Sequence, residues 1–320
     1  MKPIFSIVIP LFNKEKEIQQ TLESVLKQTF HDFEVIIIND GSTDKSEQIV
    51  NSFTDERILL ISTDNKGVSQ ARNFGINYAN GEIIAFIDAD DYWFPNHLEK
   101  LFELHQKFPE TGLLATNYEF YFSEHNIIRP TFDGIPAENW SGIVKDFFKS
   151  SMTYRLAWTS AVAVPKAILD KIGCFDETIT LGAGEDTDLW IRIAVDYPVA
   201  FSTEISARYN MTAQNKISFS DTTKRNFARL DKFYQQEKVN PSLKKFLDLY
   251  RVVYALKHKL AGDEKNFAYY YSAIAMENCP LKSRILLKLP TFILKKLFVF
   301  GRLLNSNKMY FNFYTRLFKS

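Results

Sequence analysis

Three carboxylates follow directly on the apolar run Ile83–Ile87. The run has the composition of a buried strand, and Asp88, Asp90 and Asp91 come at its end. Carboxylates this close raise one another's pKa unless a cation neutralises them, and Mg2+ and Mn2+ prefer oxygen ligands. Asp88 and Asp90 would lie on the same side of an extended backbone. We therefore expect a divalent cation that holds phosphate here, with one carboxylate taking the cation while the other accepts from a sugar or ribose hydroxyl; the alternative is a helix cap.

Two more charged segments could flank such a site. Asp40 follows the apolar run Glu34–Ile38, within the turn-forming sequence Asn39–Asp44, and a carboxylate at a strand end can accept a hydrogen bond from a nucleobase N–H. Lys66 and Arg72 come before and within a predicted helix, and either cation could bind diphosphate or base carbonyls. The alternatives are an ordinary capped turn and a solvated basic helix face.

A further acidic pair, Glu185 and Asp186, follows the flexible sequence Gly-Ala-Gly at 182–184. If this loop folds over the site, one carboxylate can act as general base, provided that it reaches the hydroxyl whose proton it removes. Capping of the helix expected over Thr187–Asp196 is the alternative.

The composition argues against several other chemistries. The five histidines are scattered, and two cysteines, Cys174 and Cys279, are too few for a disulfide scaffold and suggest a reducing compartment. No Gly-x-Gly-x-x-Gly, Walker lysine loop or Gly-x-Ser-x-Gly motif occurs. The apolar stretch near the amino terminus is shorter than the hydrophobic region of a signal peptide. We therefore expect a cytoplasmic protein that holds phosphate through a metal and side chains.

A largely parallel sheet must position these residues. Short β-branched runs alternate with longer amphipathic stretches up to about residue 90, a pattern typical of strands joined by crossover helices. Ligands of such sheets bind beyond the carboxyl ends of the strands, so the polar segments there should converge on one crevice. We expect an α/β fold with a mixed, mainly parallel sheet flanked by helices. The predicted strands are Phe5–Ile9, Glu34–Ile38, Ile58–Ser62 and Ile83–Ile87, with weaker ones near 112–116 and 118–122, and the predicted helices are Glu15–Gln28, Ser46–Ser52, Val68–Tyr78, His97–Phe108, Pro165–Ile172 and Thr187–Asp196.

Charge divides the chain into two parts. Residues 221–320 hold 20 Lys/Arg and 7 Asp/Glu, a net charge of +13, whereas residues 1–220 carry −12. We expect a catalytic domain over 1–220 and a basic, aromatic helical extension over 221–320. The stretch Leu286–Leu304 is too charged to span a bilayer but suits an interfacial helix on anionic lipid, so 281–320 could contact the inner face of the cell membrane. The alternative is an ordinary helix packed on the catalytic domain.

Several motifs, taken together, resemble those of family 2 inverting glycosyltransferases with the GT-A fold. The resemblance extends from residue 4 to about 220. It implies that Asp40 and Arg72 contact the nucleotide, with the loop from Pro10 to Asn13 beneath it. The motifs are Ser6–Asn13, Ile38–Asp44, Gly67–Asn73, Asp88–Asp91, Gly173–Glu177 and Gly184–Trp190.

The same resemblance implies roles for the acidic residues. Asp88 would meet the ribose or the metal-bound phosphate, Asp90 would ligate Mg2+ or Mn2+, and Asp91 would support both. In the pair Glu185 and Asp186, the aspartate would deprotonate the acceptor hydroxyl.

The sequence departs from the family pattern at two places. Cys174 stands where the family often has a second glycine, and Arg208–Lys216 lacks the histidine that many members place near the diphosphate. Gln-x-x-Arg-Trp, the mark of processive synthases, is absent. The resemblance thus implies transfer of a single sugar from a nucleoside-diphosphate sugar, most often a UDP-sugar, to a hydroxyl of a glycan or lipid-linked acceptor in surface polysaccharide synthesis.

Two other functions would explain parts of the sequence. A sugar-nucleotide nucleotidyltransferase would share the donor site, but no Gly-rich, Arg/Lys loop follows the first strand. A nucleic-acid-binding protein would account for the basic tail but leave the three carboxylates at 88–91 unexplained. We therefore expect no nucleic-acid partner.

Overall fold

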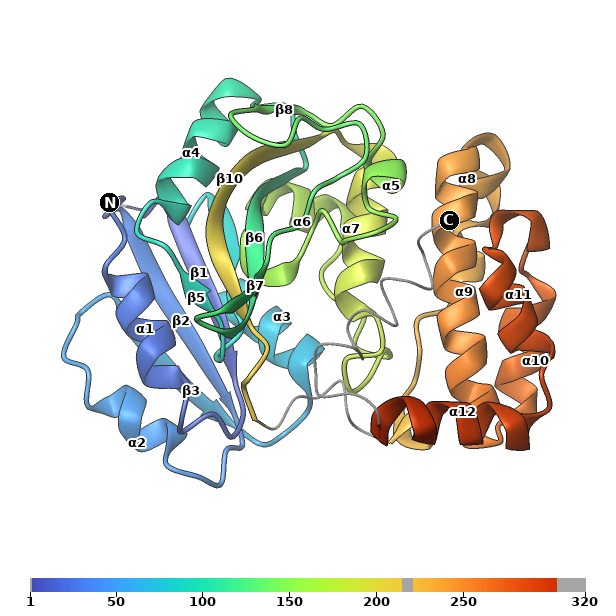
Figure 1. The fold of residues 1–320 in the computed structure, drawn as a ribbon. Helices are drawn as coiled ribbons and strands as arrows, with labels where there is room; N and C mark the ends of the chain where they lie inside the picture. Colours follow the sequence, from blue (N-terminus) through green and yellow to red (C-terminus); the bar gives the residue numbers. More distant parts are fainter. Residues whose placement is uncertain (1, 215–220, 304–320) are drawn as a thin grey trace. The chain divides into compact units, whose positions relative to one another are not determined.

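The computed structural model describes residues 2–214 and 221–303 and separates into two compact units (Figure 1). The first unit comprises residues 1–131, 135–145 and 156–219, and the second comprises 132–134, 146–155 and 220–320. Two short segments from the middle of the sequence therefore belong with the carboxy-terminal helices. The predicted assignment of separate roles to 1–220 and 221–320 stays a prediction.

A ten-stranded mixed sheet forms the centre of the first unit (Figure 1). Its strands are β1 (Phe5–Leu11), β2 (Phe33–Asp40), β3 (Ile58–Thr63), β4 (Ile83–Phe86), β5 (Tyr92–Trp93), β6 (Leu113–Ser123), β7 (Asn126–Ile128), β8 (Ser141–Ile143), β9 (Val162–Pro165) and β10 (Val199–Asn210). Their order is β3-β2-β1-β4-β9-β6-β10-β5, with β7 beside β6 and β8 beside β10. β1 to β4 run parallel, while β9 runs antiparallel between β4 and β6. The predicted fold class is confirmed.

The register of the first strands brings their carboxyl ends to one edge of the sheet. Residues 7–9 of β1 are fully buried, as expected for a parallel strand covered on both faces. Phe5 of β1 pairs with both Phe33 of β2 and Ile83 of β4. The loops that follow these strands therefore emerge close together.

The later strands differ from the sequence-based expectation. The two strands predicted near 112–116 and 118–122 form one long strand, β6. Asn117 at its middle is buried, and its side-chain amide donates to the Pro130 carbonyl, so a residue of low strand propensity is accommodated without a break. The short antiparallel strand β9 was not predicted.

Helices flank the sheet, and one of them approaches it closely at a glycine. They are α1 (Ile18–Leu26), α2 (Ser46–Asn51), α3 (Val68–Tyr78), α4 (His97–Lys107), α6 (Lys166–Ile172) and α7 (Glu185–Asp196). α3 packs on β1 and β2, and a Cβ added at Gly75 would lie 2.5 Å from Val8 Cγ1. α7 begins at Glu185 rather than at the predicted Thr187, directly after Gly184, whose φ of +106° suits glycine.

The second unit is a helical bundle around one long helix. Its helices are α5 (Phe147–Ser150), α8 (Tyr234–Val239), α9 (Pro241–Ala261), α10 (Glu264–Ser272), α11 (Leu281–Lys288) and α12 (Thr291–Leu303). α9 contacts each of the other five. On α9, Arg251 donates to Glu237 at 2.7 Å and to Asp248 at 3.0 Å, which neutralises charge inside the bundle.

The interfacial helix predicted over Leu286–Leu304 is instead divided between α11 and α12. Pro290 disfavours helical geometry at the residue before it, and Leu289 is extended with ψ of 143°. Residue 304 lies outside the described residues. No described helix is both long enough and apolar enough to cross a membrane.

Candidate active site

The loops after β1 and β2 are tied together at the carboxyl edge of the sheet. The Asn13 amide donates to Ser42 Oγ at 3.0 Å, and the Thr43 amide donates to Asn13 Oδ1 at 2.8 Å. Asn13 has a φ of +51°, a left-handed conformation that asparagine tolerates better than most residues. Pro10 is half-buried and lies in β1, one residue before the strand ends. Of the predicted residues, Pro10 therefore belongs to the strand and Asn13 to a structured loop beside that of Asp40.

Asp40 joins the end of β2 to the start of α3. Its Oδ1 accepts from the Lys66 amide at 2.7 Å and its Oδ2 from the Gly67 amide at 2.9 Å. Burial raises the pKa of Asp40 above its ordinary value, while these two amides and the Lys66 charge oppose the shift. Each carboxylate oxygen retains a second lone pair, so Asp40 can still accept from a ligand.

Arg72 is a buried cation that connects two acidic segments. From α3 its guanidinium donates to Asp88 Oδ1 at 2.7 Å and to Glu185 Oε1 at 3.2 Å, and it lies 5.2 Å from the Phe175 ring centroid. Its side chain is only 4% exposed. Asp88 follows β4 and Glu185 begins α7, so this one side chain brings the end of the sheet and the second acidic pair together.

Glu185 and Asp186 have different environments although they are neighbours. Glu185 is buried against Arg72, and burial together with the nearby Asp186 raises its pKa despite the guanidinium. Asp186 is half-buried, and its Oδ1 accepts from the Thr187 amide at 2.6 Å. Glu185 is therefore suited to holding the segment in place, and Asp186 to contacting a substrate.

Asp91 is held from two distant parts of the chain. Its Oδ2 accepts from Ser160 Oγ at 2.6 Å and its Oδ1 from the Asn210 amide at 3.1 Å. The Asp88 amide in turn donates to Ser160 Oγ at 3.0 Å. Burial, followed by the charges of Asp90 and Asp88, raises the pKa of Asp91 well above its ordinary range. Ser160 thus connects the Asp91 carboxylate with the backbone of Asp88, a role that its sequence context did not indicate.

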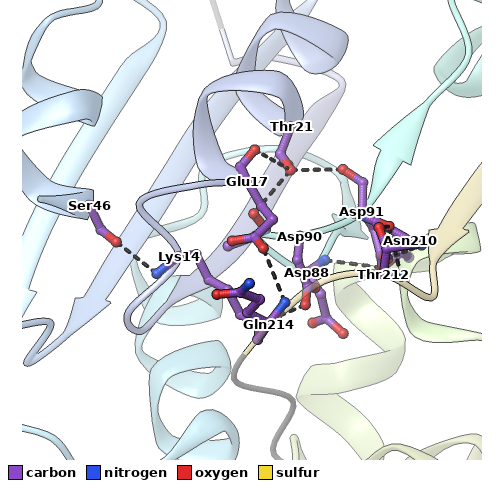
Figure 2. A network of polar contacts seen from close by, with 12 residues as sticks. Lys14, Glu17, Thr21, Ser46, Asp88, Asp90, Asp91, Asn210, Thr212 and Gln214 are labelled. Atoms are coloured by element: carbon purple, nitrogen blue, oxygen red, sulfur yellow. Dashed lines mark hydrogen bonds and ion pairs between the residues drawn. The ribbon is translucent and has the colours of Figure 1, made fainter. Parts of the chain in front are cut away.

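Asp90 pairs with a lysine that sequence reasoning did not assign to the site. Lys14 Nζ lies 2.7 Å from Asp90 Oδ2 and 2.7 Å from the Gln214 carbonyl oxygen. Figure 2 shows this network, in which the Gln214 amide also donates to Glu17 and Thr21 lies beside Asp91. The position of Lys14 in the loop after β1 was the one available signal.

The carboxylate oxygens of the site suit a hard divalent cation whose remaining ligands come from a substrate. The described residues form no group of three or more Asp, Glu, His or Cys that could hold a metal by itself. Mg2+ commonly takes one or two protein carboxylates and completes its shell with water and substrate phosphates. Asp88 and Asp90 each carry a carboxylate that now pairs with a side-chain cation, and the charges of both already perturb Asp91. They therefore fit a cation that binds together with a diphosphate.

The structure thus gathers most, but not all, of the predicted side chains. Arg72 connects Asp88 with Glu185, while Asp90 and Asp91 follow Asp88 along the chain. Lys66 contributes its backbone amide, but its side chain is exposed and has no ion-pair partner within the part of the chain that the structure describes. The predicted ligand roles of all these residues stay predictions.

Both the sequence and the fold are similar to those of known proteins. Residues 6–166 match the family described as glycosyl transferase family 2. A Rickettsia bellii protein described as an uncharacterized glycosyltransferase is 36% identical over 193 residues, which are 59% of this chain and 26% of that protein. The Escherichia coli protein described as UDP-Glc:alpha-D-GlcNAc-diphosphoundecaprenol beta-1,3-glucosyltransferase WfaP is 32% identical over 192 residues, which are 59% of this chain and 70% of WfaP.

A solved structure shares the fold. The crystal structure of S. aureus TarS 1-349 in complex with UDP-GlcNAc is 18% identical in sequence, with a TM-score of 0.55 over 85% of this chain and 91% of that one. Aligned lengths vary widely among the sequence relatives, and this chain spans only about a quarter of the R. bellii protein.

The bridge made by Arg72 should be essential to stability. Arg72→Met should lower the free energy of unfolding by about 3–5 kcal/mol, because it leaves Glu185 buried without a counter-charge. The double variant Arg72→Met/Glu185→Leu should recover much of this loss, since no uncompensated buried charge remains there. Urea unfolding followed by tryptophan fluorescence measures both.

The matched control is Arg57→Met, whose guanidinium pairs with Asp55 in a partly exposed site. Loss of this ion pair should lower the free energy of unfolding by less than about 1 kcal/mol. A single Arg72→Met variant as stable as the wild type would contradict the importance of the bridge.

Proposed function

Because the chain belongs to glycosyl transferase family 2, we propose that it transfers a single sugar from a UDP-sugar to a hydroxyl of a lipid-linked glycan, with inversion at the anomeric carbon. The reaction would require Mg2+ or Mn2+ and would contribute to surface polysaccharide synthesis. Asp40 and the loop from Pro10 to Asn13 would bind the nucleotide, and Asp88 and Asp90 the cation.

One observation carries this proposal: Arg72 connects Asp88 at the end of β4 with Glu185 at the start of α7. A single buried cation then positions both the carboxylate proposed to bind the donor and the segment that carries the candidate base. A transfer reaction needs this proximity, because the acceptor oxygen must reach the anomeric carbon while its proton is removed.

Asp186 would act as the general base. It would take the proton of the acceptor hydroxyl while that oxygen forms a bond to the anomeric carbon from the face opposite the diphosphate. The bond from the anomeric carbon to the diphosphate oxygen breaks, and its electron pair leaves with the nucleoside diphosphate. A bound divalent cation would supply several kcal/mol of stabilisation to the charge on that leaving group. Glu185, buried on Arg72, would position Asp186.

The relatives support the choice of donor and acceptor. The names of WfaP and WfgD of Escherichia coli both specify a UDP-glucose donor and a GlcNAc-diphosphoundecaprenol acceptor. TarS has been crystallised with UDP-GlcNAc and with UDP. A UDP-sugar and a polyprenyl-diphosphate-linked glycan are therefore the substrates to test first.

The second unit carries a surface that would suit an anionic membrane. On α11 and α12 four large apolar side chains are exposed: Leu281 by 72%, Ile285 by 51%, Phe292 by 65% and Leu297 by 48%. Exposed lysines lie among them, and no acidic residue follows Glu277 in the sequence. Apolar side chains mixed with lysines are typical of interfacial helices on anionic lipid. We call these exposed apolar and lysine side chains of α11 and α12 the basic apolar face. It would bring the enzyme to a lipid-linked acceptor.

A panel of sugar nucleotides tests the proposed reaction. With a GlcNAc-diphospholipid acceptor, release of nucleoside diphosphate should occur with a UDP-sugar and should require Mn2+ or Mg2+. Asp186→Asn should reduce turnover by about 100- to 10,000-fold, the usual contribution of a general base. The control is Asp196→Asn at the exposed opposite end of α7. Unchanged turnover in Asp186→Asn would exclude this residue as the base.

Vesicle sedimentation tests the basic apolar face. The protein should bind vesicles of phosphatidylglycerol and phosphatidylcholine more strongly than vesicles of phosphatidylcholine alone, and salt should weaken the binding. Replacing Lys295 and Lys296 by Gln should lower the partition coefficient by tenfold or more, at about 1 kcal/mol per charge. Phe292→Ser should also weaken binding, whereas Val239→Ser, 85% exposed on α8, should not. Equal binding to neutral and anionic vesicles would contradict the proposal.

A further inference from the structure

Lys14 is held inside the candidate site both at its backbone and at the tip of its side chain. Its backbone amide donates to Ser46 Oγ at 2.8 Å, and its Nζ donates to Asp90 Oδ2 and to the Gln214 carbonyl, each at 2.7 Å. The Lys14 and Asp90 side chains are both only 12% exposed. This ion pair is therefore largely shielded from solvent, unlike the exposed lysine pairs elsewhere on the surface.

Repulsion among the neighbouring carboxylates explains why Lys14 pairs with Asp90. Asp88, Asp90 and Asp91 lie within four positions of one another. Arg72 neutralises Asp88, and Ser160 and a backbone amide support Asp91. Asp90 has Lys14 as its ion-pair partner. Without a cation there, the negative charges would repel one another at close range.

We propose that Lys14 is the resident cation of the donor site: it neutralises Asp90 while no divalent ion is bound, and it moves to the donor diphosphate when the ion takes Asp90. This inference rests on the proposed function, which supplies the divalent ion and the diphosphate. It makes Lys14 a donor-binding residue and makes metal binding depend on the nucleotide.

The chemistry of the two cations requires this competition. The Asp90 oxygen that accepts from an ammonium at 2.7 Å is one that a divalent ion would use. Lysine is a compact point charge on a flexible stem, so its Nζ can shift while the backbone stays on Ser46, and lysine is a common phosphate ligand. The ammonium has three donors, of which the described residues engage two, on Asp90 and Gln214. Its remaining donor and its charge suit a phosphate oxygen.

A coupling between metal and nucleotide follows. In the absence of nucleotide the ion must displace Lys14 from Asp90, which weakens metal binding. With nucleotide present, the displaced ammonium binds the diphosphate instead, and this new contact strengthens metal binding. Such coupling is reciprocal, so the metal must strengthen nucleotide binding by the same factor.

Mn2+ binding, measured by electron paramagnetic resonance with and without UDP, tests this inference without any turnover. Lys14→Met should bind Mn2+ alone several-fold more tightly than the wild type. The factor by which UDP tightens Mn2+ binding should fall by about tenfold, within the range usual for coupled sites. Lys14→Gln should behave in the same way and guards against misfolding of the Met variant, which circular dichroism would reveal.

The matched control is Lys16→Met. Lys16 Nζ donates to the side chain of Gln214, at Oε1, over 2.8 Å. It should bind Mn2+ and UDP as the wild type does. Wild-type Mn2+ affinity in both Lys14 variants, with and without UDP, would overturn the inference and leave the proposed function intact. Failure of the wild type to bind Mn2+ even with UDP would overturn both.

Discussion

Neutralisation of buried negative charge is the constraint on which the candidate site depends. The carboxyl ends of β1, β2 and β4 meet at one edge of the sheet, and the acidic residues that follow can remain there only if cations or hydrogen-bond donors face them. Arg72 pairs with Asp88 and Glu185, and Lys14 pairs with Asp90. Asp91 accepts hydrogen bonds from a serine hydroxyl and a backbone amide.

The two cations differ in a way that matches what each has to do. Arg72 is planar and buried, with two carboxylates fixing its orientation, so it provides a rigid reference between the sheet and α7. Lys14 has a flexible stem and pairs with one carboxylate, that of Asp90, among the residues that the structure describes. A fixed arginine and an adjustable lysine would allow one side of the site to stay in place while the other responded to ligand.

Sequence reasoning succeeded where local pattern determines structure. The first four strands and α3 were predicted because apolar runs and amphipathic stretches alternate regularly there, and the carboxylates at their ends follow from that order. It failed where distant segments meet. Lys14 contacts Asp90 across 76 residues and Gln214 across 200, and Ser160 contacts Asp91 across 69. A solitary serine or lysine carries no local signal of such partners, and the short strand β9 has too few residues for a pattern.

The insertion of β9 between β4 and β6 has a consequence for how the chain assembles during synthesis. Asp91 emerges early, but the hydroxyl that faces it arrives with Ser160, just before β9, and the amide that completes its shell arrives only with Asn210 at the end of β10. A nascent chain that has formed the first four strands therefore carries its acidic cluster only partly supported. Completion of the candidate site waits for the final strand of the sheet to dock.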